Sequence, residues 1–252
     1  MITLPDGRRV HCHKKTINLM KKLLMLIPSL FIVFICQNAN AQSQPSILDM
    51  TGGIKDALLQ GTNKSTSALS AVNGFLGNAA VKILFPPEAQ KAEKTLRSLG
   101  MGKLCDQVIV SLNRAAEDAA GQAEPIFIDA IKHMSVDDAT NILLGPPDAA
   151  TQYFKRTTSA ELFAKFKPVI QGSLNKVNAT KYYGNVAGEY NKLPFVKHLN
   201  PDIADYATQK AIDGIFIEIA AEELNIRKNL SARSTPMMRK AFSFAEMAKK
   251  AL

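Results

Sequence analysis

Helix start and stop signals recur along this chain of 252 residues, and they constrain its fold more than any other feature. Each start places a proline or a polar cap at the first turn of a helix, and two of the stops are glycines, Gly100 and Gly121. The starts lie at residues 86–88, 124–125, 135–138, 158–161, 200–202 and 235–236, and those at 135–138 and 158–161 read as capping boxes. We therefore expect an all-α fold, a single-domain bundle of about nine or ten helices joined by short loops.

Residues 74–87, GFLGNAAVKILFPP, depart from this pattern. Val81, Ile83 and Phe85 alternate with Lys82 and Leu84 before two prolines, which predicts a short extended arm or hairpin. The arm is either a loop pinned by buried apolar side chains or a lid over a pocket. An aromatic set between lysines in residues 153–183 likewise forms either core or an apolar cavity. The candidate residues for an apolar ligand or lid are Phe75, Ile83, Phe85, Phe163, Phe166 and Tyr182.

The N-terminal part of the chain reads as an export signal. Lys21 and Lys22 precede an uncharged run over residues 23–35, and Ala39 and Ala41 supply small residues before a cleavage site. The run is shorter than the ~18 residues that span a bilayer. We interpret residues 20–41 as a signal peptide cut after Ala41, and residues 1–19 as sequence upstream of a start at Met20. The mature protein is then expected to be periplasmic or secreted.

Residues 42–252 are expected to form one helical domain, in which residues 243–252 make an amphipathic, basic C-terminal extension. The formal net charge of the chain is +9, but six basic residues and one acidic residue lie in residues 1–41. The remaining 25 basic and 21 acidic residues give +4, an ordinary charge that does not indicate nucleic-acid binding. Cys105 is the only cysteine after residue 41, so we expect no internal disulfide bond.

The helix expected over residues 205–227 has apolar residues on several sides, which predicts that it is central and largely buried. Polar residues interrupt its apolar part. A buried Asp213 would need a cation or several donors. In the helix expected over residues 101–120, the side chains of Asp106, Asn113, Arg114 and Glu117 lie opposite the core stripe. Two interpretations stay open: these groups pair locally to fix packing, or they face a ligand. The candidate polar cluster is Arg114, Asn113, Gln209, Lys210 and Asp213.

Several motifs, SLNRAAE at 111–117, DYATQKAIDGIF at 205–216, NIRKN at 225–229 and ARST at 232–235, give the chain a resemblance to a known family. With GKL at 102–104, the chain resembles, from about residue 47 to 241, the bacterial secreted family known as domain of unknown function 4197. The resemblance implies one helical extracytoplasmic domain and carries no catalytic residue to this chain. The tail FSFAEMAKKAL extends beyond the family pattern.

The sequence lacks the HExxH, CxxC and G-x-S-x-G motifs, and His133 and His198 have no Cys, His or spaced carboxylate pair around them, so we expect no metal site and no cofactor. We assign no catalytic residue. The favoured hypothesis is a non-enzymatic extracytoplasmic domain that binds an apolar small molecule, a lipid or an envelope protein. The alternatives are a hydrolase-type enzyme that uses a carboxylate and Arg cluster, and a structural protein-interaction module. The basic C-terminal helix also predicts peripheral contact with a membrane.

Overall fold

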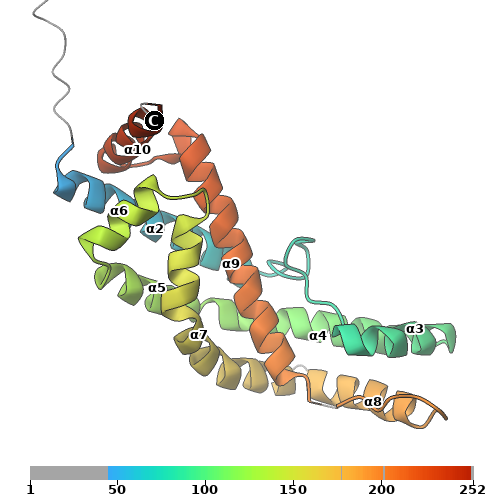
Figure 1. Cartoon of the computed structure of the whole chain (residues 1–252). Helices are drawn as coiled ribbons and strands as arrows, with labels where there is room; N and C mark the ends of the chain where they lie inside the picture. The colour runs from blue at the N-terminus through green and yellow to red at the C-terminus, as the bar shows by residue number, and fades with distance from the viewer. Residues whose placement is uncertain (1–44, 177, 201, 251–252) are drawn as a thin grey trace, which may run out of the picture. The chain divides into compact units, whose positions relative to one another are not determined.

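A computed structural model describes residues 45–176, 178–200 and 202–250, and these residues form one compact helical unit (Figure 1). No β-strand occurs in these ranges, so the expected all-α class and single helical domain are confirmed. The predicted signal peptide and residues 1–19 lie outside the described residues.

The helices follow one another along the chain, most of them with short connections. They are α2 (Ile47–Ser70), η2 (Pro87–Ala89), α3 (Gln90–Ser98), α4 (Gly102–Ala120), α5 (Ala123–Lys132), α6 (Val136–Leu144), α7 (Ala149–Lys176), α8 (Ala179–Asn191), α9 (Ala204–Lys228), η3 (Leu230–Ala232) and α10 (Pro236–Lys250).

Local capping determines several of these boundaries. Ser135 and Asp138 make the predicted capping box of α6, with the Asp138 amide donating to Ser135 Oγ over 3.0 Å. The Thr235 hydroxyl accepts from the Met238 amide at the start of α10. Gly100 ends the α3 region in the left-handed conformation, at φ 86°, that glycine adopts without strain.

The predicted helix start at residues 158–161 is wrong. Helix α7 runs through this segment from Ala149 to Lys176. The Thr158 hydroxyl donates over 2.7 Å to the Phe154 carbonyl, one turn earlier in the same helix, instead of capping a new one. A Thr-x-x-Glu sequence inside a helix is therefore not a start signal when the preceding residues already have helical partners.

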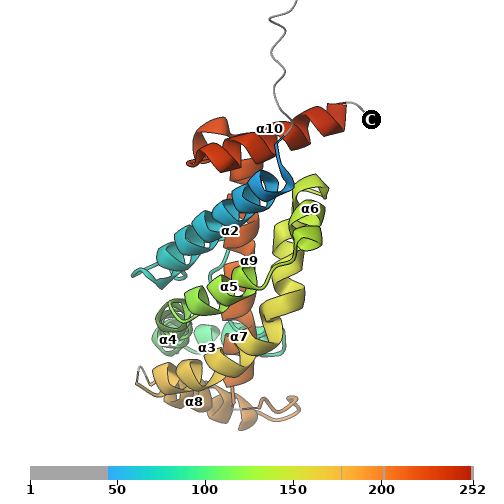
Figure 2. The same ribbon diagram turned by 90° about the vertical axis from the view of Figure 1, so that its left-hand side faces the viewer.

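Helix α9 is central, as its apolar residues on several sides predict. It packs against α7, α2 and α4, and it runs from the end that carries α8 to the end that carries α10 (Figures 1 and 2). Its buried residues Ile212, Ile215, Phe216 and Ile219 contribute to one hydrophobic core that all the α-helices from α2 to α10 share.

The C-terminal helix α10 packs closely on α2. A Cβ atom on Gly53 would come within 2.4 Å of the Met237 carbonyl oxygen, so glycine is required where the two backbones meet. Met238, Ala241 and Phe242 of α10 are buried at this contact and around it. The apolar face of the described part of α10 therefore packs within its own domain. Membrane contact through this helix stays a prediction.

Candidate functional site

The arm at residues 74–87 lies against α4 as a loop without hairpin strands. Asn113 of α4 holds it like a strand partner: its Oδ1 accepts from the Ile83 amide and its Nδ2 donates to the Ile83 carbonyl, both over 2.8 Å. Glu117, one turn further along α4, accepts from the amides of Phe75 and Leu76. Two side chains of one helix thus bind four backbone groups of the arm.

Arg114 completes this contact. Its guanidinium donates to Glu117 and to the Asn73 side chain. Arg114 thus pairs with Glu117, as one of the two interpretations expected. The face of α4 that carries Asn113 and Glu117 is nevertheless not solvated, because the arm covers it and buries both side chains.

Gln209, Lys210 and Asp213 form a separate group on α9. The Gln209 amide donates to Asp213 over 2.9 Å and Lys210 Nζ lies 3.3 Å from its carboxylate. The expectation that Asp213 is buried is wrong, because its side chain is 41% exposed. No hydrogen bond or ion pair among the described residues joins this group to Arg114 or Asn113.

The arm explains why a glycine, Gly214, follows Asp213 in the IDG sequence. A Cβ atom on Gly214 would lie 2.6 Å from Cε1 of Phe75 and 3.3 Å from Val81 Cβ. The arm therefore rests directly on the backbone of α9 at Gly214.

The candidate apolar residues are mostly part of the core. Phe75, Ile83 and Phe85 on the arm and Phe166 on α7 are buried. Phe163 and Tyr182 are partly buried and pack against the core from outside. In this structure the arm is pinned by its apolar side chains.

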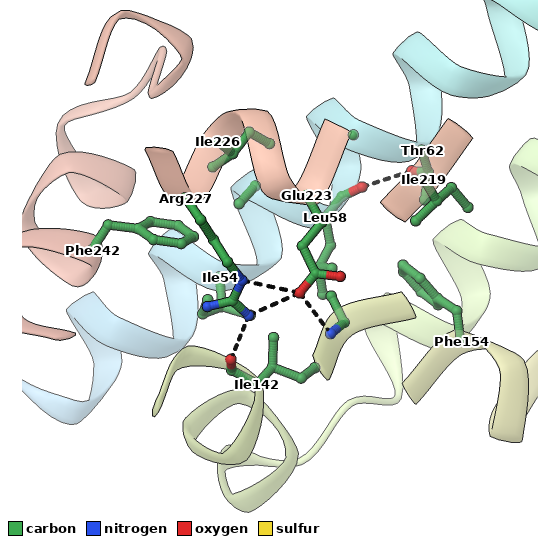
Figure 3. A pocket seen from close by; sticks show the side chains of 13 residues that line it. Ile54, Leu58, Thr62, Ile142, Phe154, Ile219, Glu223, Ile226, Arg227 and Phe242 are labelled. Atoms are coloured by element: carbon green, nitrogen blue, oxygen red, sulfur yellow. Dashed lines mark hydrogen bonds and ion pairs between the residues drawn. The ribbon is translucent and has the colours of Figure 1, made fainter. Parts of the chain in front are cut away.

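A buried ion pair that the sequence analysis did not single out joins three helix ends (Figure 3). The Glu223 carboxylate on α9 accepts from the Ala150 and Thr151 amides at the start of α7, each over 2.9 Å, and from the Thr151 hydroxyl. It also accepts from Arg227 Nε and Nη2 at 3.1 and 2.8 Å. Arg227 Nη2 donates onward to the Ile142 carbonyl at the end of α6. The pair caps one helix start and one helix end at once.

A small pocket lies beside this ion pair, between Ile54, Leu58, Phe154 and Ile226 (Figure 3). Its lining is mostly apolar and its volume is about 30 Å³, close to the space of a single water molecule. The pocket is too small for a lipid chain or a drug-sized ligand.

Arg233, in the ARST motif, is almost completely buried in the turn between α9 and α10. It donates to the Ile226 and Arg227 carbonyls and to Glu246, and its guanidinium lies over the Phe242 ring at 5.1 Å. These contacts fold the chain back after α9, so the NIRKN and ARST motifs anchor the C-terminal helix.

An open groove between α4 and α8 brings two candidate residues together. It has a volume of about 380 Å³ and a mostly apolar lining. Its walls are Asp106, Gln107, Val110, Ser111, Arg114 and Tyr182. Arg114 from the candidate polar cluster and Tyr182 from the candidate apolar set thus line one surface, whereas the other candidates lie elsewhere.

Helical periodicity could have indicated this groove through Val110, which is exposed although it is apolar. Asp106 at the groove wall pairs with Arg97 of α3 over 2.8 Å, and this contact helps to raise the pKa of the Arg97 guanidinium. The charge at this wall is therefore held in place by a second helix.

Within residues 45–176, 178–200 and 202–250, no group of three or more His, Cys, Asp or Glu side chains is arranged to hold a metal ion. None of the helices in these ranges combines the length and the apolar character needed to cross a bilayer.

The fold and its buried polar contacts define a class: a single-domain all-α protein in which buried charged side chains bind helix ends and loop backbone. The chain belongs to the family described as "Protein of unknown function (DUF4197)", which matches residues 44–243. Comparisons with curated proteins and with solved structures find no match.

Proposed function

We propose that the protein is a non-enzymatic extracytoplasmic domain that binds a small amphipathic molecule in the groove between α4 and α8. The observation that carries this proposal is the groove itself, whose volume of about 380 Å³ lies in the range of small-molecule sites. Export is inferred from the signal-peptide pattern of residues 20–41.

The walls of the groove suit a molecule with an apolar body and an anionic end. Val110 and Tyr182 supply apolar surface. Arg114 supplies a cation whose orientation is already fixed by Glu117 and Asn73, so little side-chain entropy is lost when a ligand binds.

A dansylated fatty acid is a suitable probe, because its fluorescence rises when it enters an apolar site. We expect saturable binding to the mature protein and at least about tenfold weaker binding to Val110→Glu, which places a carboxylate in the groove. Val110 is 41% exposed, so the substitution leaves the core intact.

Ile217→Glu is the matched control, since Ile217 is also β-branched, lies mid-helix on α9 and is 44% exposed. It is expected to bind the probe like the unmodified protein. Equal binding by both variants and the unmodified protein would contradict the proposal, as would the absence of saturable binding to the unmodified protein.

A further inference from the structure

The loop between α8 and α9 is closed at its base by one side chain. Asn191, the last residue of α8, accepts from the Leu199 amide over 2.9 Å and donates to the Leu199 carbonyl over 3.2 Å. Leu199 is buried, and Leu193 and Val196 pack partly against the core. Residues 192–198 therefore form a loop that is fixed at its base and along both sides.

Phe195 at the apex of this loop is fully exposed. Its backbone has φ 62°, in the left-handed region that a bulky aromatic residue rarely occupies. The ring buries no surface within the domain, and the backbone conformation costs free energy. A strained conformation that presents an aromatic ring to solvent indicates a contact outside the domain.

The surroundings of Phe195 are basic. Lys192, Lys197 and His198 are exposed on the same loop. Lys192 pairs with Glu189 over 2.7 Å, whereas Lys197 and His198 make no hydrogen bond or ion pair with other described residues. The loop thus combines one apolar prong with cations on long stems.

A second exposed apolar side chain lies at the same end of the domain. Helix α3 packs against α8, and the turn from α3 to α4 lies beside the end of α8 (Figure 1). This turn carries exposed Leu99, and exposed Lys103 follows it at the start of α4. The end formed by this turn and the loop at residues 192–198 is therefore apolar at its tips and basic around them.

We propose that the loop at residues 192–198 anchors the protein to an anionic phospholipid surface. The Phe195 ring enters the boundary between headgroups and acyl chains, and Lys192 and Lys197 contact the headgroup phosphates. A lipid surface fits these groups because it offers many equivalent phosphates to flexible cations around a single apolar insertion. The proposal does not depend on a ligand in the groove between α4 and α8.

Co-sedimentation of the mature protein with vesicles tests the anchor. We expect binding to vesicles of equal parts phosphatidylglycerol and phosphatidylcholine, and much weaker binding to phosphatidylcholine alone. Phe195→Asn should lower binding to the anionic vesicles at least about tenfold, because an inserted ring contributes most of the apolar area. Lys197→Gln should lower it about fivefold.

Phe195→Asn also tests folding separately. Asparagine tolerates a positive φ better than phenylalanine, so this variant should unfold at the same or a higher urea concentration than the unmodified protein. The matched control is Leu48→Asn on α2, an exposed leucine (78%) next to Asp49, which pairs with Lys240 of α10. Helix α10 and the start of α2 lie at the end of the domain opposite α8 (Figure 1). It should bind vesicles normally.

Three results would overturn the anchor: no binding of the unmodified protein to anionic vesicles, unchanged binding of Phe195→Asn, or loss of binding in Leu48→Asn, which would place the contact at the α2 and α10 end. Val110→Glu is expected to keep its vesicle binding, so failure of the groove and failure of the anchor are distinguishable.

Discussion

Replacing Glu223 by glutamine tests whether the buried ion pair holds the helix ends together. The substitution keeps the size of the side chain but removes the charge that meets Arg227 and the start of α7. Glu223 accepts five hydrogen bonds, and the side chains of Glu223 and Arg227 are only 6% and 12% exposed. Breaking one side of a buried pair typically costs about 3–5 kcal/mol. Because glutamine still accepts some of these bonds, we expect a loss of about 2–4 kcal/mol.

Urea unfolding followed by circular dichroism measures this loss as a lower midpoint at an unchanged slope. Glu189→Gln is the control, since its pair with Lys192 is exposed and should contribute less than about 0.5 kcal/mol. A double-mutant cycle of Glu223→Ala and Arg227→Ala should give a coupling energy of at least about 1 kcal/mol. If Glu223→Gln unfolds within about 0.5 kcal/mol of the unmodified protein, the ion pair does not have the structural role described here.

Four further outcomes are expected. Gly214→Ala should lower the free energy of unfolding by about 1–3 kcal/mol because its Cβ would press on the buried Phe75 ring, although alanine favours helices. A higher free energy of unfolding, measured with urea, would contradict this contact. Asp213→Asn should change that free energy by less than about 0.5 kcal/mol, since its partners are exposed; a larger loss in the same assay would refute a surface role. Burial raises the pKa of the Cys105 thiol, so Ellman's reagent should label it much more slowly in the native protein than in denaturant, and equal rates would contradict its burial. Burial also raises the pKa of Tyr183 to about 12, above the ~10 of an unfolded phenol, so its contribution to stability should be present below pH ~10 and lost as the pH rises toward 12. Tyr183→Phe should reduce this pH dependence of the free energy of unfolding in alkaline urea titrations, and equal pH dependence in the two proteins would refute it.

The fold class followed from local signals, which is why it could be predicted. A cap such as Ser135 or Thr235 acts within a few residues of itself, so its partner is visible in the sequence. Thr158 shows the limit of this reasoning. Its neighbours match a capping box, but its hydroxyl donates to the Phe154 carbonyl one turn earlier.

The roles of the polar residues could not be read from single helices. A helical projection places Asn113 and Glu117 opposite the core of α4, but the arm that covers them comes from residues some 30 to 40 positions earlier. Glu223 likewise meets Thr151 across 72 positions. Partners that are distant in sequence decide which polar side chain is buried, as the exposed Asp213 and the buried Glu223 on the same helix show.

Phe195 could not be recognised from residue type alone. A phenylalanine between partly buried Leu193 and Val196 is expected in the core, and only its exposure in the structure shows that it points outward. Two residues of the groove between α4 and α8, Arg114 and Tyr182, were selected from the sequence, but as members of two separate candidate sets. That these two line one surface was not predicted.

Native mass spectrometry of the mature protein, exported and purified without detergent, tests the proposed ligand binding most directly. We expect a second mass peak that exceeds the polypeptide mass by that of one small amphipathic molecule, and its loss in Val110→Glu but not in Ile217→Glu. A spectrum that contains only the bare polypeptide, or an added mass that Val110→Glu leaves unchanged, would contradict binding in the groove between α4 and α8.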